Sequence, residues 1–135
     1  MKYILIHDSS HKPRLDIAHL IEEQLDDLGI NSSIYCLDEN IEDLCEFGFA
    51  YCFDEMKEFF KERNTEYVII PDITIKHELD FFGDDAELVL YFKSSKKSEF
   101  FKTFDVENNK MIIAKDDDEF LKNLIIDVLL KEREI

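Results

Sequence analysis

Residues 3–29, YILIHDSSHKPRLDIAHLIEEQLDDLG, decide the fold class of this protein. The stretch opens with four apolar residues typical of a β-strand and then breaks at the polar residues 7–10. From Leu15 to Leu28, apolar residues recur every three or four positions, which is the period of an amphipathic helix. Gly29 follows in the position where glycine often ends a helix. The stretch therefore predicts a strand that leads directly into a helix.

The rest of the chain repeats this alternation. Further strands are predicted over residues 34–37, 66–70, 88–92 and 110–114, and further helices over residues 41–60, 77–82, 95–104 and 116–129. Strands that alternate with helices predict an α/β protein with a mostly parallel sheet, and right-handed crossovers place helices on both of its faces. We predict one domain over residues 1–135, a doubly wound three-layer sandwich with a five-stranded parallel sheet.

One part of this pattern is ambiguous. Between residues 45 and 54 the aromatic residues also alternate with small ones, which is the period of a strand. The helical flanks favour one long helix through this region, and the strand reading stays open. In a helix, Phe47, Tyr51 and Phe59 fall beside the apolar stripe that faces the core. The segment 47–60 fits the core of the domain. Because exposed aromatic patches are uncommon on monomers, the alternative is that it forms a homodimer or partner interface.

Composition excludes several classes of partner. The 135 residues include 16 Lys and Arg against 32 Asp and Glu, a formal net charge of −16. Such a chain lacks the clustered positive charge that binds nucleic acid or anionic membranes. No apolar run reaches the roughly 20 residues of a membrane helix. Three cysteines with no metal-binding spacing predict free thiols in a reducing cytoplasm.

Polar residues follow the predicted strands, where open α/β sheets bind their ligands. Asp8 follows the first strand, Asp72 the third and Lys115 the fifth. Two carboxylates suit Mg²⁺, and a lysine beside them offers a compact positive charge for a phosphoryl group. No Gly-rich dinucleotide fingerprint, phosphate-binding loop or nucleophile elbow is present in the sequence, so an enzyme is not predicted.

These residues carry a resemblance to a known family. Residues 4–10 (ILIHDSS), 68–73 (VIIPDI) and 111–115 (MIIAK) resemble the strand ends of the receiver domains of two-component response regulators. The resemblance implies a flavodoxin-like fold with strand order 2-1-3-4-5. It also implies that Asp8 and Asp72 bind Mg²⁺, that Asp72 accepts a phosphoryl group and that Lys115 stabilises it. A kinase or another signalling protein is then the implied partner.

Each of these residues also has a structural interpretation. Asp72 is placed to start a turn or to cap the following segment, and Asp8 is placed to begin a helix. Lys115 fits a solvated loop, and His7 fits a buried, hydrogen-bonded side chain. The sequence thus favours a stand-alone receiver-like signalling domain that acts through protein–protein contact. A flavodoxin-like domain that binds a small ligand, and a non-catalytic assembly subunit, are the alternatives.

Overall fold

The computed structural model describes residues 1–8, 10, 12–73, 81–82, 85–92, 111–114 and 117–127. Its strands are β1 (Lys2–Asp8), β2 (Ser32–Ile34), β3 (Tyr67–Ile70), β4 (Ala86–Phe92) and β5 (Met111–Ala114). Its helices are α1 (Leu15–Asp27), the short 3₁₀ helix η1 (Asp38–Asn40), α2 (Ile41–Phe47), α3 (Phe49–Glu62) and α5 (Asp118–Ile125). The predicted helix over residues 95–104, and most of the one over 77–82, lie outside the described residues.

The strands pair in parallel in the order β2-β3-β1-β4-β5. The predicted α/β class with a parallel sheet is confirmed. The predicted order 2-1-3-4-5 is wrong in two places, because β2 pairs with β3 instead of β1, and β4 pairs with β1 instead of β3. The expectation that β1 and β3 are neighbours holds.

Strand length and burial explain the observed order. β1 and β4 have seven residues each, six of them buried, and they pair side by side from Tyr3 to Asp8. This pairing keeps the two longest apolar strands in the middle of the sheet, where both faces are covered. β2 has only three residues, two of them serine and none fully buried, and it forms an edge.

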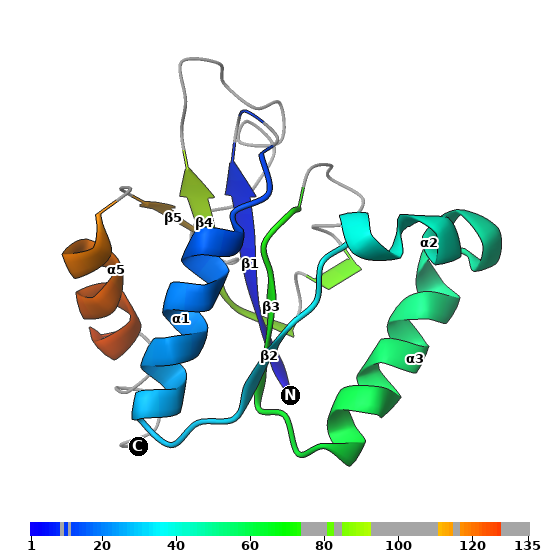
Figure 1. Cartoon of the computed structure of the whole chain (residues 1–135), viewed down its shortest axis with the longest axis horizontal. Coiled ribbons are helices and arrows are strands. Elements are labelled where there is room, and N and C mark those ends of the chain that lie inside the picture. The colour runs from blue at the N-terminus through cyan, green and yellow to red at the C-terminus, as the bar shows by residue number, and fades with distance from the viewer. Residues whose placement is uncertain are drawn as a thin grey trace.

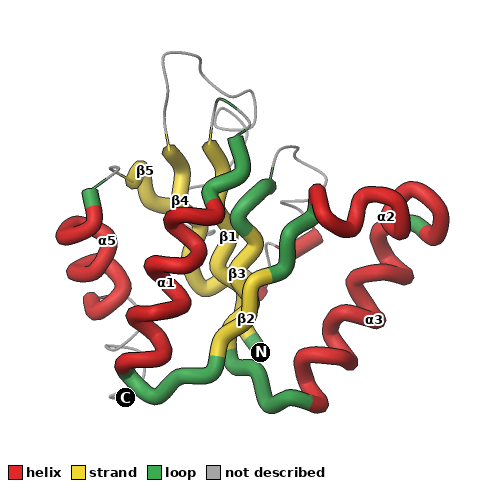
Figure 2. Tube along the Cα trace, viewed as in Figure 1, coloured by secondary structure: helices red, strands yellow, loops and turns green. Residues whose placement is uncertain are grey.

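Helices cover both faces of the sheet (Figures 1 and 2). α1 and α5 pack on one face, where Ile17, Ile21 and Leu121 meet the side chains of alternate strand residues such as Ile4 and Ile6. α2 and α3 lie on the other face, on the side chains of the intervening strand residues. This arrangement follows from the two-residue period of a strand, which sends neighbouring side chains to opposite faces.

The predicted helix over residues 41–60 is broken at Gly48 into α2 and α3. Gly48 has φ 87° and ψ 158°, a backbone conformation that is essentially restricted to glycine. The region is helical on both sides of this break, so the strand reading of residues 45–54 is wrong. The predicted core stripe holds in part. Leu44, Phe53 and Phe60 are buried, whereas Ile41 and Cys45, which were also predicted to face the core, are exposed.

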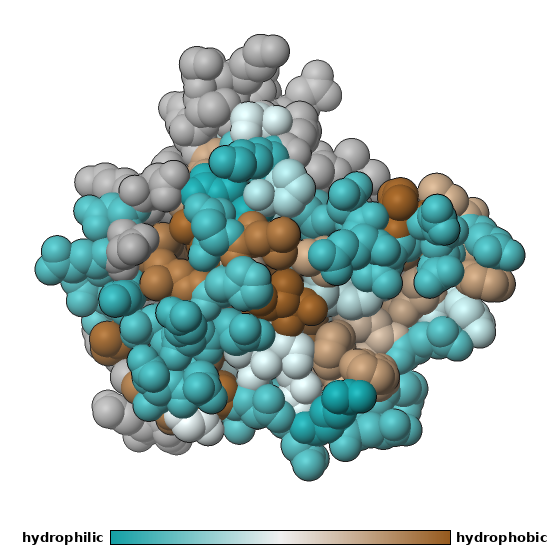
Figure 3. Space-filling view, in the orientation of Figure 1, coloured by the Kyte–Doolittle hydropathy of each residue, from teal (hydrophilic) through white to brown (hydrophobic). Residues whose placement is uncertain are grey.

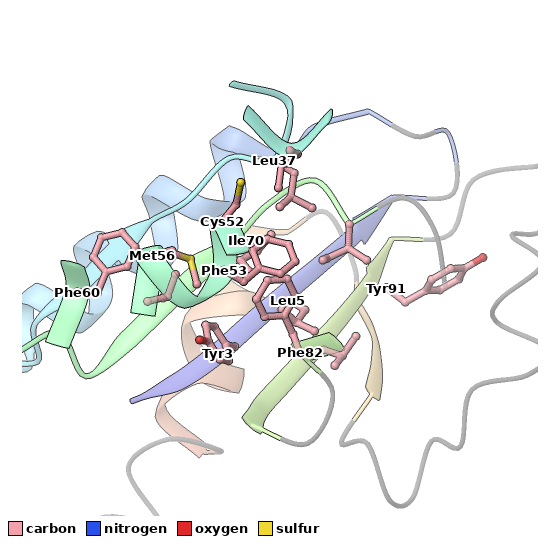
Figure 4. Packing of buried hydrophobic residues seen from close by; sticks show 14 residues of the cluster. Tyr3, Leu5, Leu37, Cys52, Phe53, Met56, Phe60, Ile70, Phe82 and Tyr91 are labelled. Carbon is pink, nitrogen blue, oxygen red and sulfur yellow. The ribbon is translucent and has the colours of Figure 1, made fainter. Parts of the chain in front are cut away.

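Phe53 lies at the centre of the core under α3. Its side chain is fully buried, and its ring lies 4.4 Å from that of Phe82 and 4.6 Å from that of Phe81, measured between centroids. Figure 4 shows this cluster, in which Phe53 projects from α3 toward the strand residues Leu5 and Ile70. The aromatic-rich sequence thus supplies the large side chains that fill the space between α3 and the sheet.

Two helix ends match the sequence patterns closely. Gly29 lies two residues beyond the end of α1 with φ 76°, as its helix-ending position predicted. At α5 the side chain of Asp117 accepts hydrogen bonds from the backbone N–H groups of Glu119 and Phe120. Residue 116, where this helix is predicted to begin, lies outside the described residues. Among the helices described, none is long and apolar enough to cross a membrane.

Candidate functional site

The carboxyl ends of β1, β3 and β4 lie along one edge of the sheet, beside the start of α1 (Figure 1). From β1 the chain runs through α1 to β2, at one edge of the sheet, whereas from β4 it runs to β5, at the other edge. Connections diverge in this way at a topological switch point, where open α/β sheets bind ligands. The predicted residues Asp8 and Asp72 lie at this edge, at or just beyond the ends of β1 and β3.

Asp8, at the end of β1, is paired with Arg14. One oxygen of the Asp8 carboxylate accepts from the Arg14 guanidinium at 3.0 Å, and the other accepts from the backbone N–H and the hydroxyl of Ser10 at 2.8 and 2.6 Å. Both side chains of the pair are about nine-tenths buried. The Arg14 guanidinium also binds Asp16 and lies 4.4 Å from the centroid of the Phe92 ring.

These contacts set the ionisation of the site. Burial by itself raises the pKa of Asp8, but the hydrogen bonds from Ser10 and Arg14 outweigh it and hold that pKa below its usual value. The hydrogen bonds from Arg14 lower the pKa of Asp16 in the same way, against some desolvation. Asp8 is thus an ionised, fully engaged carboxylate, and Arg14 is the residue of this edge that sequence reasoning missed. Its only signal was a lone arginine six residues after Asp8.

Asp72, just beyond β3, binds the turn that follows β2. Its two carboxylate oxygens accept hydrogen bonds from the backbone N–H groups of Leu37 and Asp38, at 2.9 and 2.8 Å. The side chain is buried, and desolvation raises its pKa although these amides oppose the change. Asp72 therefore acts as a cap that holds the start of η1 against the sheet. β2 shares only Ile34 with the strand predicted over residues 34–37, because the strand begins two residues earlier and the chain turns into η1 after Leu37.

His7 is buried on the other side of β1 from Asp8. Its ring Nδ1 lies 2.6 Å from the backbone carbonyl oxygen of Ile73, so this nitrogen carries the proton and donates. The ring stacks on Tyr91 with centroids 5.6 Å apart. His7 therefore fits the structural interpretation, since it ties β1 to the segment after β3.

The two predicted metal ligands are engaged by different parts of the protein. Asp8 turns to Arg14 at the start of α1, whereas Asp72 turns to the segment between β2 and α2. A divalent cation at Asp8 would compete with the buried guanidinium of Arg14 on one oxygen and with Ser10 on the other. In the part of the chain that the structure describes, no three His, Cys, Asp or Glu side chains gather as metal ligands. Lys115 lies outside that part, and the Mg²⁺ site stays a prediction.

Replacing Asp72 with Asn is expected to lower the free energy of unfolding by about 1–3 kcal/mol. An amide side chain can accept only one of the two N–H groups and turns its own NH₂ toward the other. Asp38→Asn makes the same charge change on an exposed side chain and should cost less than about 0.5 kcal/mol. Urea titration followed by circular dichroism measures both. Equal stabilities of the two variants would contradict a capping role for Asp72.

A second feature lies on the outer side of α2 and α3. A groove of about 800 Å³ runs between these helices and Tyr35, next to the edge strand β2. Phe47, Tyr51 and Phe59 line it and remain about half exposed. Figure 3 shows apolar surface over α2 and α3, bordered by hydrophilic surface. These three aromatic side chains lie beside the core-facing stripe, where the helical period places them, and the interface expected of them stays a prediction.

The groove is also acidic. Its lining includes the five carboxylates of Asp43, Asp54, Glu55, Glu58 and Glu62, and none of the described lining residues is Lys, Arg or His. Near one end, the guanidinium of Arg63 lies 4.1 Å from the centroid of the Phe59 ring. The face thus combines exposed aromatic rings with a negative rim. Sequence reasoning found the rings and missed the rim, because the acidic residues are scattered along α2 and α3.

Comparisons with protein-family models, with curated proteins and with solved structures find no match to this chain.

Proposed function

We propose that this chain is a signalling domain of the cytoplasm that acts by binding another protein. The groove between α2 and α3 carries this proposal. Three half-exposed aromatic side chains, Phe47, Tyr51 and Phe59, share this one face. Aromatic residues are enriched at the centres of protein interfaces, because they bury a large area for little loss of side-chain freedom.

The strand-end acids support an interaction role over phosphotransfer. Both oxygens of Asp72 already accept backbone hydrogen bonds, and both oxygens of Asp8 are bound by Ser10 and Arg14. An aspartate that accepts a phosphoryl group must present an oxygen to the donor, and Asp72 would have to give up its cap to do so. The strand order also differs from the order that receiver domains and flavodoxins have in common. The proposal therefore rests on the surface more than on the resemblance.

The test compares two matched double variants as bait. Phe47→Ser/Tyr51→Ser alters the groove, and Leu15→Ser/Leu28→Ser removes two exposed apolar side chains from α1 and the residue after it. We expect wild type and the α1 variant to bind the same purified partner, and the groove variant to bind it at least about tenfold more weakly. A partner whose affinity is the same for all three proteins would place the contact elsewhere and overturn the proposal.

A phosphodonor assay tests phosphotransfer directly. The protein is incubated with acetyl phosphate and Mg²⁺, and its intact mass is measured. We expect no change in mass and no shift of the melting temperature between chelator and Mg²⁺. A gain of one phosphoryl group that Asp72→Asn abolishes would instead establish phosphotransfer to this protein that depends on Asp72.

A further inference from the structure

We infer that the groove between α2 and α3 binds a basic amphipathic helix, whose apolar side chains contact the aromatic rings while its Lys and Arg residues meet the acidic rim. This inference rests on the proposed interaction function and names the chemistry of the partner. It follows from the sign of the charge on the groove, from the net charge of the chain and from the shape of the neighbouring sheet edge.

The charge on the groove selects a basic partner. Asp54, Glu58 and Glu62 are exposed along α3 and line the same groove as the aromatic rings. A positively charged segment is attracted to this face before contact, and the attraction is strengthened by the net charge of −16. Aromatic rings attract cations, and within this protein the guanidinium of Arg63 lies 4.1 Å from the centroid of the Phe59 ring.

The same charge disfavours a second copy of this chain. A symmetric dimer through this face would bring the five carboxylates of one groove against those of the other. Like charges placed in contact cost several kcal/mol, which the burial of a few aromatic side chains must first offset. The homodimer predicted from the segment 47–60 is therefore the less favourable occupant. It remains a measurable outcome.

The shape of the edge favours a helix over an added strand. β2 is the edge strand beside the groove, and it has only three residues. Strand addition gains its affinity from backbone hydrogen bonds along an exposed edge, and three residues provide few of them. The groove is instead lined by side chains from two helices and from Tyr35, which suits an amphipathic helix with apolar anchors one turn apart.

Synthetic peptides test the inference. The probe is a fluorescent peptide of about four helical turns with Leu on one face and Lys on the other, and its control carries Glu in place of Lys. Fluorescence anisotropy measures binding to the full chain at low and high salt. We expect the Lys peptide to bind and the Glu peptide to bind at least about tenfold more weakly. Salt should lower the affinity of the Lys peptide, because it screens exposed charges.

Protein variants place the binding on the groove. Asp54→Asn/Glu58→Gln/Glu62→Gln should weaken the Lys peptide by about three- to tenfold and flatten its salt dependence. Neutralising Glu23, Asp26 and Asp27 at the end of α1 changes the net charge equally and should alter affinity by less than about twofold. Phe47→Ser/Tyr51→Ser should weaken binding at least about tenfold. Circular dichroism checks the fold of each variant.

Each other outcome overturns the inference in a recognisable way. An equal loss of affinity for the Lys peptide in the two charge variants would mean that the net charge of the protein, and not the groove, attracts the peptide. Equal binding of the Lys and Glu peptides would mean a purely apolar surface. Self-association in sedimentation equilibrium that Phe47→Ser/Tyr51→Ser abolishes would make a second copy the occupant. None of these three outcomes decides the proposed interaction function. That function is tested separately by the partner assay with the same groove variant.

Discussion

Replacing Arg14 with Met is expected to lower the free energy of unfolding by about 3–5 kcal/mol, because it leaves a buried carboxylate without its partner. Asp8 is 8% exposed, and Arg14 supplies the positive charge that binds it at 3.0 Å. Removing both charges together, in Asp8→Asn/Arg14→Met, should cost less than removing Arg14 alone. A smaller loss in the double variant would show that the two side chains stabilise the fold by interacting with each other. Urea titration of the single and double variants measures the coupling.

The loss caused by Arg14→Met should also depend on pH. The pKa of Asp8 is held below its usual value in the folded protein, so the pair stabilises the fold above that usual value and loses its effect as pH falls through the native pKa. We therefore expect the difference between wild type and variant to be largest near about pH 7 and to shrink toward about pH 3, where Asp8 is protonated in the variant.

Lys12→Met provides the matched control for Arg14→Met. It removes one positive charge from the same loop, but at an exposed side chain, and should change stability by less than about 0.5 kcal/mol. Arg14→Lys should fall between the two, since a lysine keeps the charge but cannot bind Asp8 and Asp16 with one planar group. A loss in Arg14→Met no larger than in Lys12→Met would contradict the buried pair.

Replacing Phe53 with Ala is expected to cost a similar amount, about 3–5 kcal/mol, because it opens a cavity beneath α3. The Phe53 ring is fully buried, with the rings of Phe81, Phe82 and Tyr35 around it. For a domain of this size the melting temperature should fall by more than about 10 °C. Differential scanning calorimetry measures this shift.

Tyr51→Ala is the control on the opposite side of the same helix. Tyr51 lies two residues before Phe53 and is 53% exposed, so its loss should change stability by less than about 1 kcal/mol. Comparing the two variants distinguishes the stability contribution of the buried face of α3 from that of its exposed face. If Tyr51→Ala proved as destabilising as Phe53→Ala, the outer aromatic residues would belong to the core and would be unsuited to a partner surface.

Polar side chains have different roles at the strand edge and in the groove. At the edge, Asp8, Arg14 and Asp72 use their hydrogen-bonding capacity within the protein. In the groove, the carboxylates of Asp54, Glu58 and Glu62 lie on exposed residues. Buried polar groups must be paired in this way, because an unpaired one costs free energy that a small domain cannot lose. Recognition is thus expected where the charges are exposed.

Local sequence determined the class of the fold and most of its elements. The apolar period from Leu15 to Leu28 and the position of Gly29 specified α1 and its end. The stripe that includes Phe53 and Phe60 specified which face of α3 is buried, and therefore which aromatic residues are exposed. Periodicity carries this information because a helix and a strand each present a fixed set of positions to a core.

The order of the strands and the use of the acidic residues were decided only by the tertiary structure. No local pattern predicts that β2 pairs with β3. The pairing of each strand depends on which strands the rest of the sheet leaves next to it, and β1 and β4 lie side by side in its middle. Likewise, Asp8 and Asp72 resemble metal ligands when they are seen as residues that follow strands. Arg14 is six residues from Asp8, and Leu37 is 35 residues from Asp72. The sequence alone gives the chemical type of each acidic residue, and its partners are known only once distant parts of the chain meet.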